Sequence, residues 1–329
     1  MKGIVRQHFN SIAIIEGDGG AGTGFIVKEG ETTRLYTAAH VIAGNKRLTV
    51  KNADGRQFLK FGVFEVASAS DLARIELLQD FDSGLRIAKQ GSMKADDPLL
   101  AIGNSGGAGA LTLLEGRVVS LGPDVVEVSN GVIQGNSGGP VFSAASGEVV
   151  AVVTHLIAGR EDLWAKETGF SGVRRFATRL DRDVTWQKVP IGKFLAEAVT
   201  LAEYNRNTRI LLALSMLDPT QDGLRLDVQV SQGGPTLLTV FNENKNVPTV
   251  AALIEMNSKL GDKRLRTSES DLRRRFSSFY DSAVTNLNRD GAKFLPDGFS
   301  GYHRKQAAQE KEWRAEALKE IQSAAARLR

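Results

Sequence analysis

Short runs of β-forming residues, separated by glycine-containing turns, follow one another from residue 4 to about residue 186. The runs are rich in Val, Ile, Phe and Thr, as in "GFIV", "RLTVKN", "LARIELL" and "EVVAVVTH". Such runs at this spacing are typical of a β-barrel or a β-sandwich. This half of the chain is therefore predicted to be all β, with little room for helices.

The pattern changes after Pro190. A long helix is predicted from residue 191 to Asp218-Pro219, because proline does not continue a helix. A last helix over 303–328 is predicted to carry an apolar stripe of Trp313, Leu318, Ile321 and Leu328. We therefore expect two domains, a β domain over residues 1–189 and a mainly helical domain over residues 190–329.

Composition narrows the class of protein further. At 329 residues the chain is long enough for two units. No apolar stretch reaches the roughly 18 to 20 residues that span a membrane, and "MKGIVRQHFNSIAII" lacks the pattern of a signal peptide. Cysteine is absent, which excludes disulfides and a cysteine nucleophile. The net charge of +4 comes without an aromatic stacking pattern, so we expect no nucleic-acid partner.

Acyl transfer is one chemistry that the β half can support. It needs a hydroxyl nucleophile, an imidazole base, a carboxylate that orients the imidazole, and amide donors for the oxyanion. His40 ends "LYTAAH", Asp71 precedes the strand "LARIELL", and Ser137 lies in the glycine-rich turn "QGNSGGP". Each residue alone is more often structural. The three together, in this order, are a more specific signal.

The pentapeptide GNSGG occurs twice, at 103–107 and at 135–139. In either copy the glycines permit a tight turn that presents the serine hydroxyl and gathers backbone amides. Local chemistry therefore does not decide whether Ser105 or Ser137 is the nucleophile.

Six segments, in order, resemble the trypsin/chymotrypsin-like serine peptidases and their HtrA (Deg) branch. They are "GTGFIV", "LYTAAHVI", "SDLARIEL", "PLLAIGNSGG", "GRVVSLG" and "GNSGGPVFSAASGEVVAVVT". The resemblance covers about residues 4–186 and implies two six-stranded β-barrels with the catalytic triad at their junction. It makes residues 1–189 a trypsin-like serine peptidase domain.

The resemblance also implies roles for individual residues. His40 is the general base and acid, Asp71 orients it, and Ser137 is the nucleophile. The backbone amides of Gly135 and Ser137 form the oxyanion hole. The first GNSGG is similar to the family's "AIGNP-x-G" segment, so Ser105 is expected to be structural. No metal and no cofactor is implied.

The substrate pocket follows from the same resemblance. Gly131 occupies the position at the base of the primary pocket, and its lack of a carboxylate gives no support to a preference for Lys or Arg. Val132, Thr154 and His155 are expected to complete a smallish, mostly apolar pocket. Thr154 also matches the position that pairs with substrate backbone and supports the triad carboxylate.

The helical tail departs from the HtrA branch, which usually carries a PDZ domain after the peptidase. Here no PDZ pattern is found, and residues 190–329 are predicted to be an accessory, oligomerisation or partner-binding region. Their amphipathic faces can equally well pack on the β domain.

We therefore predict a bacterial serine endopeptidase of protein quality control that cleaves unfolded or flexible proteins. The alternative is a latent or non-proteolytic, chaperone-like binding module that acts through the helical tail. Family members are mostly extracytoplasmic, so a periplasmic or secreted location is suspected although no signal peptide is seen. The cleavage motif and the oligomeric state do not follow from the sequence.

Overall fold

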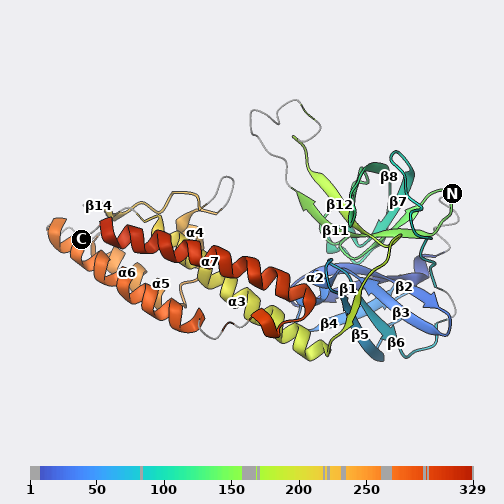
Figure 1. The fold of residues 1–329 in the computed structure, drawn as a ribbon, viewed down its shortest axis with the longest axis horizontal. Helices are drawn as coiled ribbons and strands as arrows, with labels where there is room; N and C mark the ends of the chain where they lie inside the picture. The colour runs from blue at the N-terminus through green and yellow to red at the C-terminus, as the bar shows by residue number, and fades with distance from the viewer. Residues whose placement is uncertain are drawn as a thin grey trace. The chain divides into compact units, whose positions relative to one another are not determined.

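A computed structural model describes residues 8–81, 84–157, 168, 171–217, 219–220, 223–230, 235–260, 269–291, 294 and 296–327. The chain forms two compact units (Figure 1). Unit 1 comprises residues 1–198 together with 300–302, and unit 2 comprises 199–299 together with 303–329.

An antiparallel seven-stranded sheet forms the first part of unit 1, with the strand order β13-β5-β6-β3-β2-β1-β4 (blue in Figure 1, apart from β13). Its strands are β1 (Ile12–Gly17), β2 (Ala21–Glu29), β3 (Thr32–Thr37), β4 (Leu48–Asn52), β5 (Phe61–Ala67), β6 (Ala73–Leu77) and β13 (Trp186–Lys188). Most of the large apolar residues on these strands are buried, among them Ile15, Ile26, Leu35 and Val66, although Thr23 and Thr37 are fully buried too.

A closed barrel forms the second part of unit 1, with the strand order β10-β11-β12-β9-β8-β7. Its strands are β7 (Pro98–Gly103), β8 (Thr112–Leu121), β9 (Val125–Val128), β10 (Pro140–Ser143), β11 (Val149–Ile157) and β12 (Arg174–Arg179). One core cluster is shared by the sheet and the barrel, with Phe25 and Tyr36 from the sheet and Leu100, Phe142 and Val152 from the barrel.

Only one of the two predicted six-stranded barrels is closed. In the first part, the segment between β4 and β5 contacts β4 through a bridge between Lys51 and Gln57. Two backbone bonds form it, from the Phe58 N–H to the Val50 carbonyl and from the Asn52 N–H to the Arg56 carbonyl. These contacts do not extend into a ladder, so β4 remains at one edge. At the other edge β13 pairs with β5 from Trp186↔Ala67 to Lys188↔Glu65. The prediction missed this pairing because its partners lie far apart in the chain.

Helices dominate the C-terminal region, as predicted. They are α3 (Ile191–Ser215), which begins in unit 1, and α4 (Leu237–Glu243), α5 (Pro248–Leu260), α6 (Glu269–Gly291) and α7 (Gly301–Arg327) in yellow to red in Figure 1. The short strands β14 (Pro219–Thr220) and β15 (Gly223–Leu224) form a two-stranded pair. None of the helices, over the residues described, is long and apolar enough to cross a membrane.

The buried face of α7 differs from the predicted apolar stripe. Ile321 is fully buried and Leu318 packs beside the core, but Trp313 is 45% exposed. Leu328 lies outside the described residues. The buried face instead consists of His303, Ala307, Glu310, Arg314, Ala317, Ile321, Ala324 and Ala325. Small and charged residues thus make up most of a buried face on which the hydrophobic pattern predicted large apolar ones.

Candidate functional site

His40 lies in the one-turn helix α2 (Ala39–Ala43), which begins two residues after β3 ends. Ala38 and Ala39 are fully buried at this point, so the backbone packs closely beneath the imidazole. The His40 side chain itself is 42% exposed. The imidazole is thus anchored by a rigid turn yet open to solvent and to a substrate.

Asp71 lies in the turn between β5 and β6 and binds His40 with both carboxylate oxygens. Oδ2 is 2.6 Å from the imidazole Nδ1, and Oδ1 accepts the His40 backbone N–H at 2.9 Å. Because a carboxylate only accepts hydrogen bonds, Nδ1 carries a proton and Nε2 is the ring nitrogen left to accept one. The structure therefore brings together two of the three predicted triad residues in the tautomer that general-base catalysis requires.

The pKa of His40 reflects two opposing causes. Burial of the imidazole lowers its pKa, but the hydrogen bond and the negative charge of Asp71 raise it and outweigh burial. The net result is a pKa above the ordinary histidine value of 6.5. His40 thus takes up a proton more readily than a free histidine does, as a catalytic base should.

The turn that carries Ser137 is held against the residues that precede His40. The Thr23 N–H donates to the Ser137 carbonyl at 2.8 Å, and the Gly138 N–H donates to the Val153 carbonyl at 2.8 Å. Gly138 has a φ of +85°, and a Cβ on it would lie 2.2 Å from the Thr37 Oγ1 and 3.0 Å from the Ala38 N. Only glycine fits here, and its close approach places the Ser137 turn beside the start of α2.

The hydroxyl of Ser137 forms no hydrogen bond with any residue that the structure describes. Hydrogen bonds between nucleophile and base are often long in an enzyme without substrate and tighten when substrate binds. In this structure, backbone contacts therefore place the Ser137 turn beside α2, and a hydrogen bond between Ser137 and His40 does not.

The predicted oxyanion donors are the N–H groups of Gly135 and Ser137. Gly135 has a φ of +90°, which a residue with a side chain rarely adopts. Within the described part of the chain, neither N–H has an acceptor, whereas the intervening Asn136 N–H donates to the Ile133 carbonyl at 3.1 Å. Two unoccupied donors on one turn match the chemical requirement for binding an oxyanion.

The four residues predicted for the substrate pocket lie in different surroundings. Val132 is fully buried in the barrel core, and a Cβ on Gly131 would meet open space. Thr154 is buried, and its hydroxyl lies 3.2 Å from the His155 Nδ1 and 3.2 Å from the Thr178 hydroxyl. The exposed His155 ring stacks on Phe176 at a centroid distance of 4.9 Å. Burial of the His155 ring lowers its pKa below the ordinary histidine value. The charge of Asp71 raises the pKa but does not outweigh burial.

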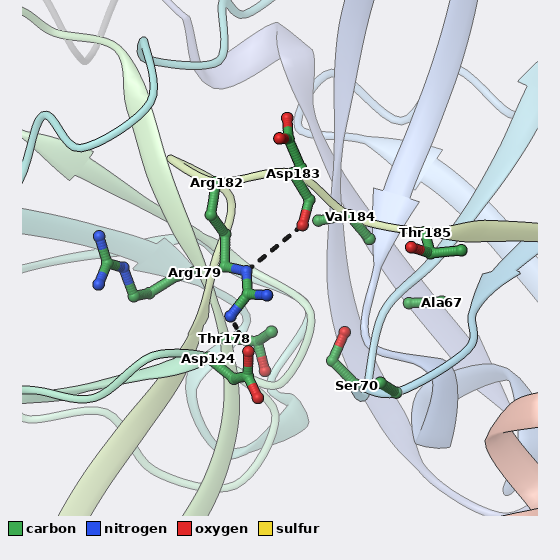
Figure 2. Close-up of a pocket in the computed structure, with 10 residues that line it drawn as sticks. Ala67, Ser70, Asp124, Thr178, Arg179, Arg182, Asp183, Val184 and Thr185 are labelled. Carbon is green, nitrogen blue, oxygen red and sulfur yellow. Dashed lines mark hydrogen bonds and ion pairs between the residues drawn. The ribbon is translucent and has the colours of Figure 1, made fainter.

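A separate small pocket lies between the turn that precedes Asp71 and the segment around Arg182 (Figure 2). It is lined by Ala67, Ala69, Ser70, Asp124, Thr178, Arg179, Arg182, Asp183, Val184 and Thr185. Arg182 pairs with Asp124 and also donates to the Asp183 carbonyl at 3.4 Å. The cavity measures about 70 Å³, which is room for a few water molecules and too little for a peptide. It is therefore a solvent-sized pocket.

Thr23 is a residue of the site that the sequence analysis missed. It is fully buried in β2. Its hydroxyl accepts the Asn104 N–H at 2.9 Å and donates to the Gly135 carbonyl at 2.8 Å. The signal in the sequence is a polar residue between two glycines, "GTG", directly before the apolar run "FIV". The described residues contain no group of three or more His, Cys, Asp or Glu that could hold a metal ion.

Residues 22–152 match the family model for a trypsin-like peptidase domain. His40, Asp71 and Ser137 all lie within the matched stretch. The chain therefore contains a trypsin-like peptidase domain, and the resemblance stated from its motifs is confirmed.

The curated relatives are of the HtrA/DegP type. A probable periplasmic serine endoprotease, DegP-like, of Rhizobium meliloti is 30% identical over 202 residues, which cover 56% of this chain and 39% of that protein. A probable periplasmic serine protease, do/HhoA-like, of Haemophilus influenzae is 29% identical over 150 residues, 42% of this chain and 31% of that protein. The matches thus span about a third of the length of these relatives.

Two solved structures each match about half of this chain. The HtrA-type protease AlgW with a tripeptide matches at a TM-score of 0.42 and 22% identity, over 54% of this chain and 59% of that one. An inactive form of Rv3671c from M. tuberculosis H37Rv matches at a TM-score of 0.42 and 24% identity, over 54% of this chain and 84% of that one.

Proposed function

We propose that this protein is a serine endopeptidase with Ser137 as nucleophile, His40 as general base and acid, and Asp71 as the carboxylate that orients His40. The observation that carries the proposal is the contact of 2.6 Å between Asp71 Oδ2 and His40 Nδ1, beside a glycine-rich turn that presents Ser137. The same three roles make up the general mechanism of acyl transfer by a serine hydroxyl.

The reaction proceeds in two halves. In the first, the Ser137 Oγ forms a bond to the peptide carbonyl carbon while its proton passes to His40 Nε2. The oxyanion accepts hydrogen bonds from the Gly135 and Ser137 amides, the C–N bond breaks, and the proton on Nε2 goes to the leaving amine. In the second half, water attacks the acyl-enzyme with His40 again as base and releases the carboxylic acid and free Ser137.

The substrate we propose is an unfolded or flexible polypeptide that binds as an extended strand. Up to Val153, β11 is flanked by β10 or by the Ser137 turn on one side and by β12 on the other. Beyond it, over residues 155–157, β11 pairs with β12 alone among the described residues, and Leu156 and Ile157 are exposed. An added strand can pair with that free edge. Gly131, Val132, Thr154 and His155 are proposed to shape the adjoining pocket.

A periplasmic location and a role in protein quality control are proposed by analogy with the relatives, which are named periplasmic proteases. Residues 190–329, beyond the peptidase domain proposed over 1–189, are proposed to bind a partner or a second copy of the chain.

The test is cleavage of an unfolded model protein, with a fluorophosphonate label run in parallel. We expect Ser137→Ala to abolish cleavage and labelling together. The matched variant Ser105→Ala changes the other GNSGG and should still be labelled. Loss of labelling in Ser105→Ala with labelling retained in Ser137→Ala would overturn the assignment of the nucleophile.

A second candidate function is a latent or non-proteolytic binding module. It accounts as well as the peptidase does for a Ser137 hydroxyl that has no hydrogen bond to His40 in the described structure. Two results together would support this candidate over the peptidase. The wild type would neither cleave nor be labelled, and the wild type and Ser137→Ala would suppress the aggregation of an unfolded protein equally well.

A further inference from the structure

The first GNSGG lies directly against the second. The Gly106 N–H donates to the Gln134 carbonyl at 2.7 Å, and Thr23 links the Asn104 N–H to the Gly135 carbonyl. The fit is close. A Cβ on Gly135 would lie 2.1 Å from the Asn104 carbonyl oxygen, and one on Gly103 would lie 2.6 Å from the Asn136 Nδ2. The two pentapeptides are thus packed closely against each other at Gly103 and Gly135.

These contacts orient the peptide that contains the Gly135 N–H. In a trans peptide the C=O and the N–H point in opposite directions. Since the Gln134 carbonyl points at Gly106, the Gly135 N–H points away from the first GNSGG. The same argument applies to Ser137, because the Asn136 carbonyl accepts the Gly139 N–H at 2.9 Å. Both proposed oxyanion donors are therefore aimed by bonds to the carbonyls before them.

Ser105 adds a side-chain contact to this arrangement. The Asn136 Nδ2 donates to the Ser105 Oγ at 2.9 Å, and Oγ also lies 3.3 Å from the Asn136 Oδ1. The Asn136 Oδ1 in turn accepts the Ile133 N–H at 2.8 Å. Asn136 is only 1% exposed and stands between the two donors. Fixing its side chain therefore fixes both flanking peptides.

We propose that Ser105 is a positioning residue of the oxyanion hole, whose hydroxyl holds Asn136 and thereby aims the Gly135 and Ser137 amides. This inference rests on the proposed peptidase function. It gives the first GNSGG a part in the reaction without any contact between Ser105 and the substrate. A proline at this position, as in the family segment, has no hydroxyl and cannot make the contact.

The first experiment compares Ser105→Ala with Ser105→Thr, which keeps the hydroxyl. Loss of one whole oxyanion donor costs about 100-fold to 1000-fold in kcat. Because Ser105→Ala only loosens the donors, we expect kcat to fall about 10-fold, with KM unchanged, and Ser105→Thr to restore most of it. Ser146→Ala, on an exposed turn of the same barrel, is the control and should leave kcat unchanged.

Two binding measurements separate positioning from general damage. A peptide boronic acid imitates the tetrahedral intermediate, so its affinity should fall with Ser105→Ala by the same factor as kcat. A substrate peptide should bind equally well to Ser137→Ala and to the double variant with Ser105→Ala. A kcat within twofold of the wild type, or a parallel loss of peptide binding, would overturn the inference.

Hydrogen exchange tests the inference even if the wild type proves inactive. The Gly106 N–H is the donor to the Gln134 carbonyl, so its protection reports directly on the contact between the two pentapeptides. We expect Ser105→Ala to lower that protection at least fivefold and Ser105→Thr to preserve it. Unchanged protection in Ser105→Ala would refute the positioning role, whereas a failed fluorophosphonate label would refute only the peptidase.

Discussion

Asp71→Asn isolates the contact on which the proposed mechanism depends. In the wild type, Oδ1 accepts the His40 backbone N–H at 2.9 Å and Oδ2 accepts from Nδ1 at 2.6 Å. An asparagine has one oxygen and one amide nitrogen. If its oxygen stays on the fixed backbone donor, its NH₂ faces Nδ1, which must then accept. The imidazole proton moves to Nε2, where it prevents His40 from taking the proton of Ser137.

The reverse orientation of the amide is also unfavourable. It would return the oxygen to Nδ1–H but would set the NH₂ against the backbone N–H, and an unmade buried hydrogen bond costs about 1–3 kcal/mol. The wrong tautomer in a triad lowers kcat by about 10⁴-fold, which is about 5.4 kcal/mol at 1.36 kcal/mol per tenfold. We therefore expect Asp71→Asn to lower turnover by about that factor.

The assay is turnover of a fluorogenic peptide as a function of pH, with Asp124→Asn as the matched control. His40 must be neutral to act as a base, so activity is lost as the pH falls through its pKa. The pKa of His40 is raised above 6.5 because Asp71 outweighs burial, so the wild-type acid limb should lie above 6.5. In Asp71→Asn only burial remains, and the limb should move to lower pH. A variant that keeps more than a tenth of wild-type turnover, or an unchanged acid limb, would refute the reasoning.

Three further predictions concern stability. Gly138→Ala places a Cβ 2.1 Å from the Thr23 carbonyl at a φ of +85°. We therefore expect it to lower the free energy of unfolding, measured in urea, by at least about 1–3 kcal/mol. Gly131→Ala, whose Cβ meets open space, should lower it by less than about 0.5 kcal/mol. Glu127 accepts from Arg174 at 2.8 and 2.7 Å, and this hydrogen bond outweighs burial and lowers the Glu127 pKa below 4.5. The stability that the pair contributes is therefore present above pH 4.5 and is lost as the pH falls through the pKa of Glu127 in the folded protein. Glu127→Gln should then cost about 1 kcal/mol at pH 7 and little at pH 3. An equal cost at both pH values would contradict this. In α7, Ile321→Ala should cost about 2–5 kcal/mol, whereas Trp313→Gln should cost less than about 0.5 kcal/mol, and the opposite ranking in thermal unfolding would show that the buried face is assigned wrongly.

The local elements of this fold were predictable from the sequence because their signals are local. Hairpins such as β1–β2 follow from alternation and glycine turns, and α3 begins at residue 191, where the helical pattern begins. Closure of a barrel is different. It depends on whether β4 pairs with β5, or whether β13, more than a hundred residues later in the chain, pairs with β5. No local pattern reports that choice.

The buried face of α7 shows a second limit of sequence reasoning. A hydrophobic pattern ranks residues by type, so it selects Trp313 and passes over Glu310 and Arg314. In the structure both charged residues are buried because α3 supplies their partners. Glu310 accepts from the Asn205 amide at 2.7 Å, and the Arg314 guanidinium lies 4.9 Å from the centre of the Tyr204 ring. Such partners are visible only once two distant helices are paired.

In the candidate site, too, some contacts were predictable from the sequence and others were not. The approach of Asp71 to His40 was predictable from residue type and order. The contacts of Ser105 and Thr23 with the oxyanion turn were not, because each depends on a hydrogen bond to a peptide in another strand or loop. The repeat of GNSGG was a local sign, visible in the sequence, of the two segments that pack against each other in the structure.

The return of residues 300–302 to unit 1 has a consequence for the order in which the chain can fold as it is synthesised. The Ser300 hydroxyl and N–H bind Glu197, and the Gly301 N–H donates to the Gln187 side chain at 2.9 Å. Tyr302 packs beside Phe194 in the same cluster as Phe64. Ribosomes add about 5–20 residues per second, so this last piece arrives about 5–20 s after residue 198. The peptidase half therefore waits for almost the whole of the helical region to be translated before its packing is complete, and a nascent chain stalled before residue 300 should remain more sensitive to added protease than the released protein.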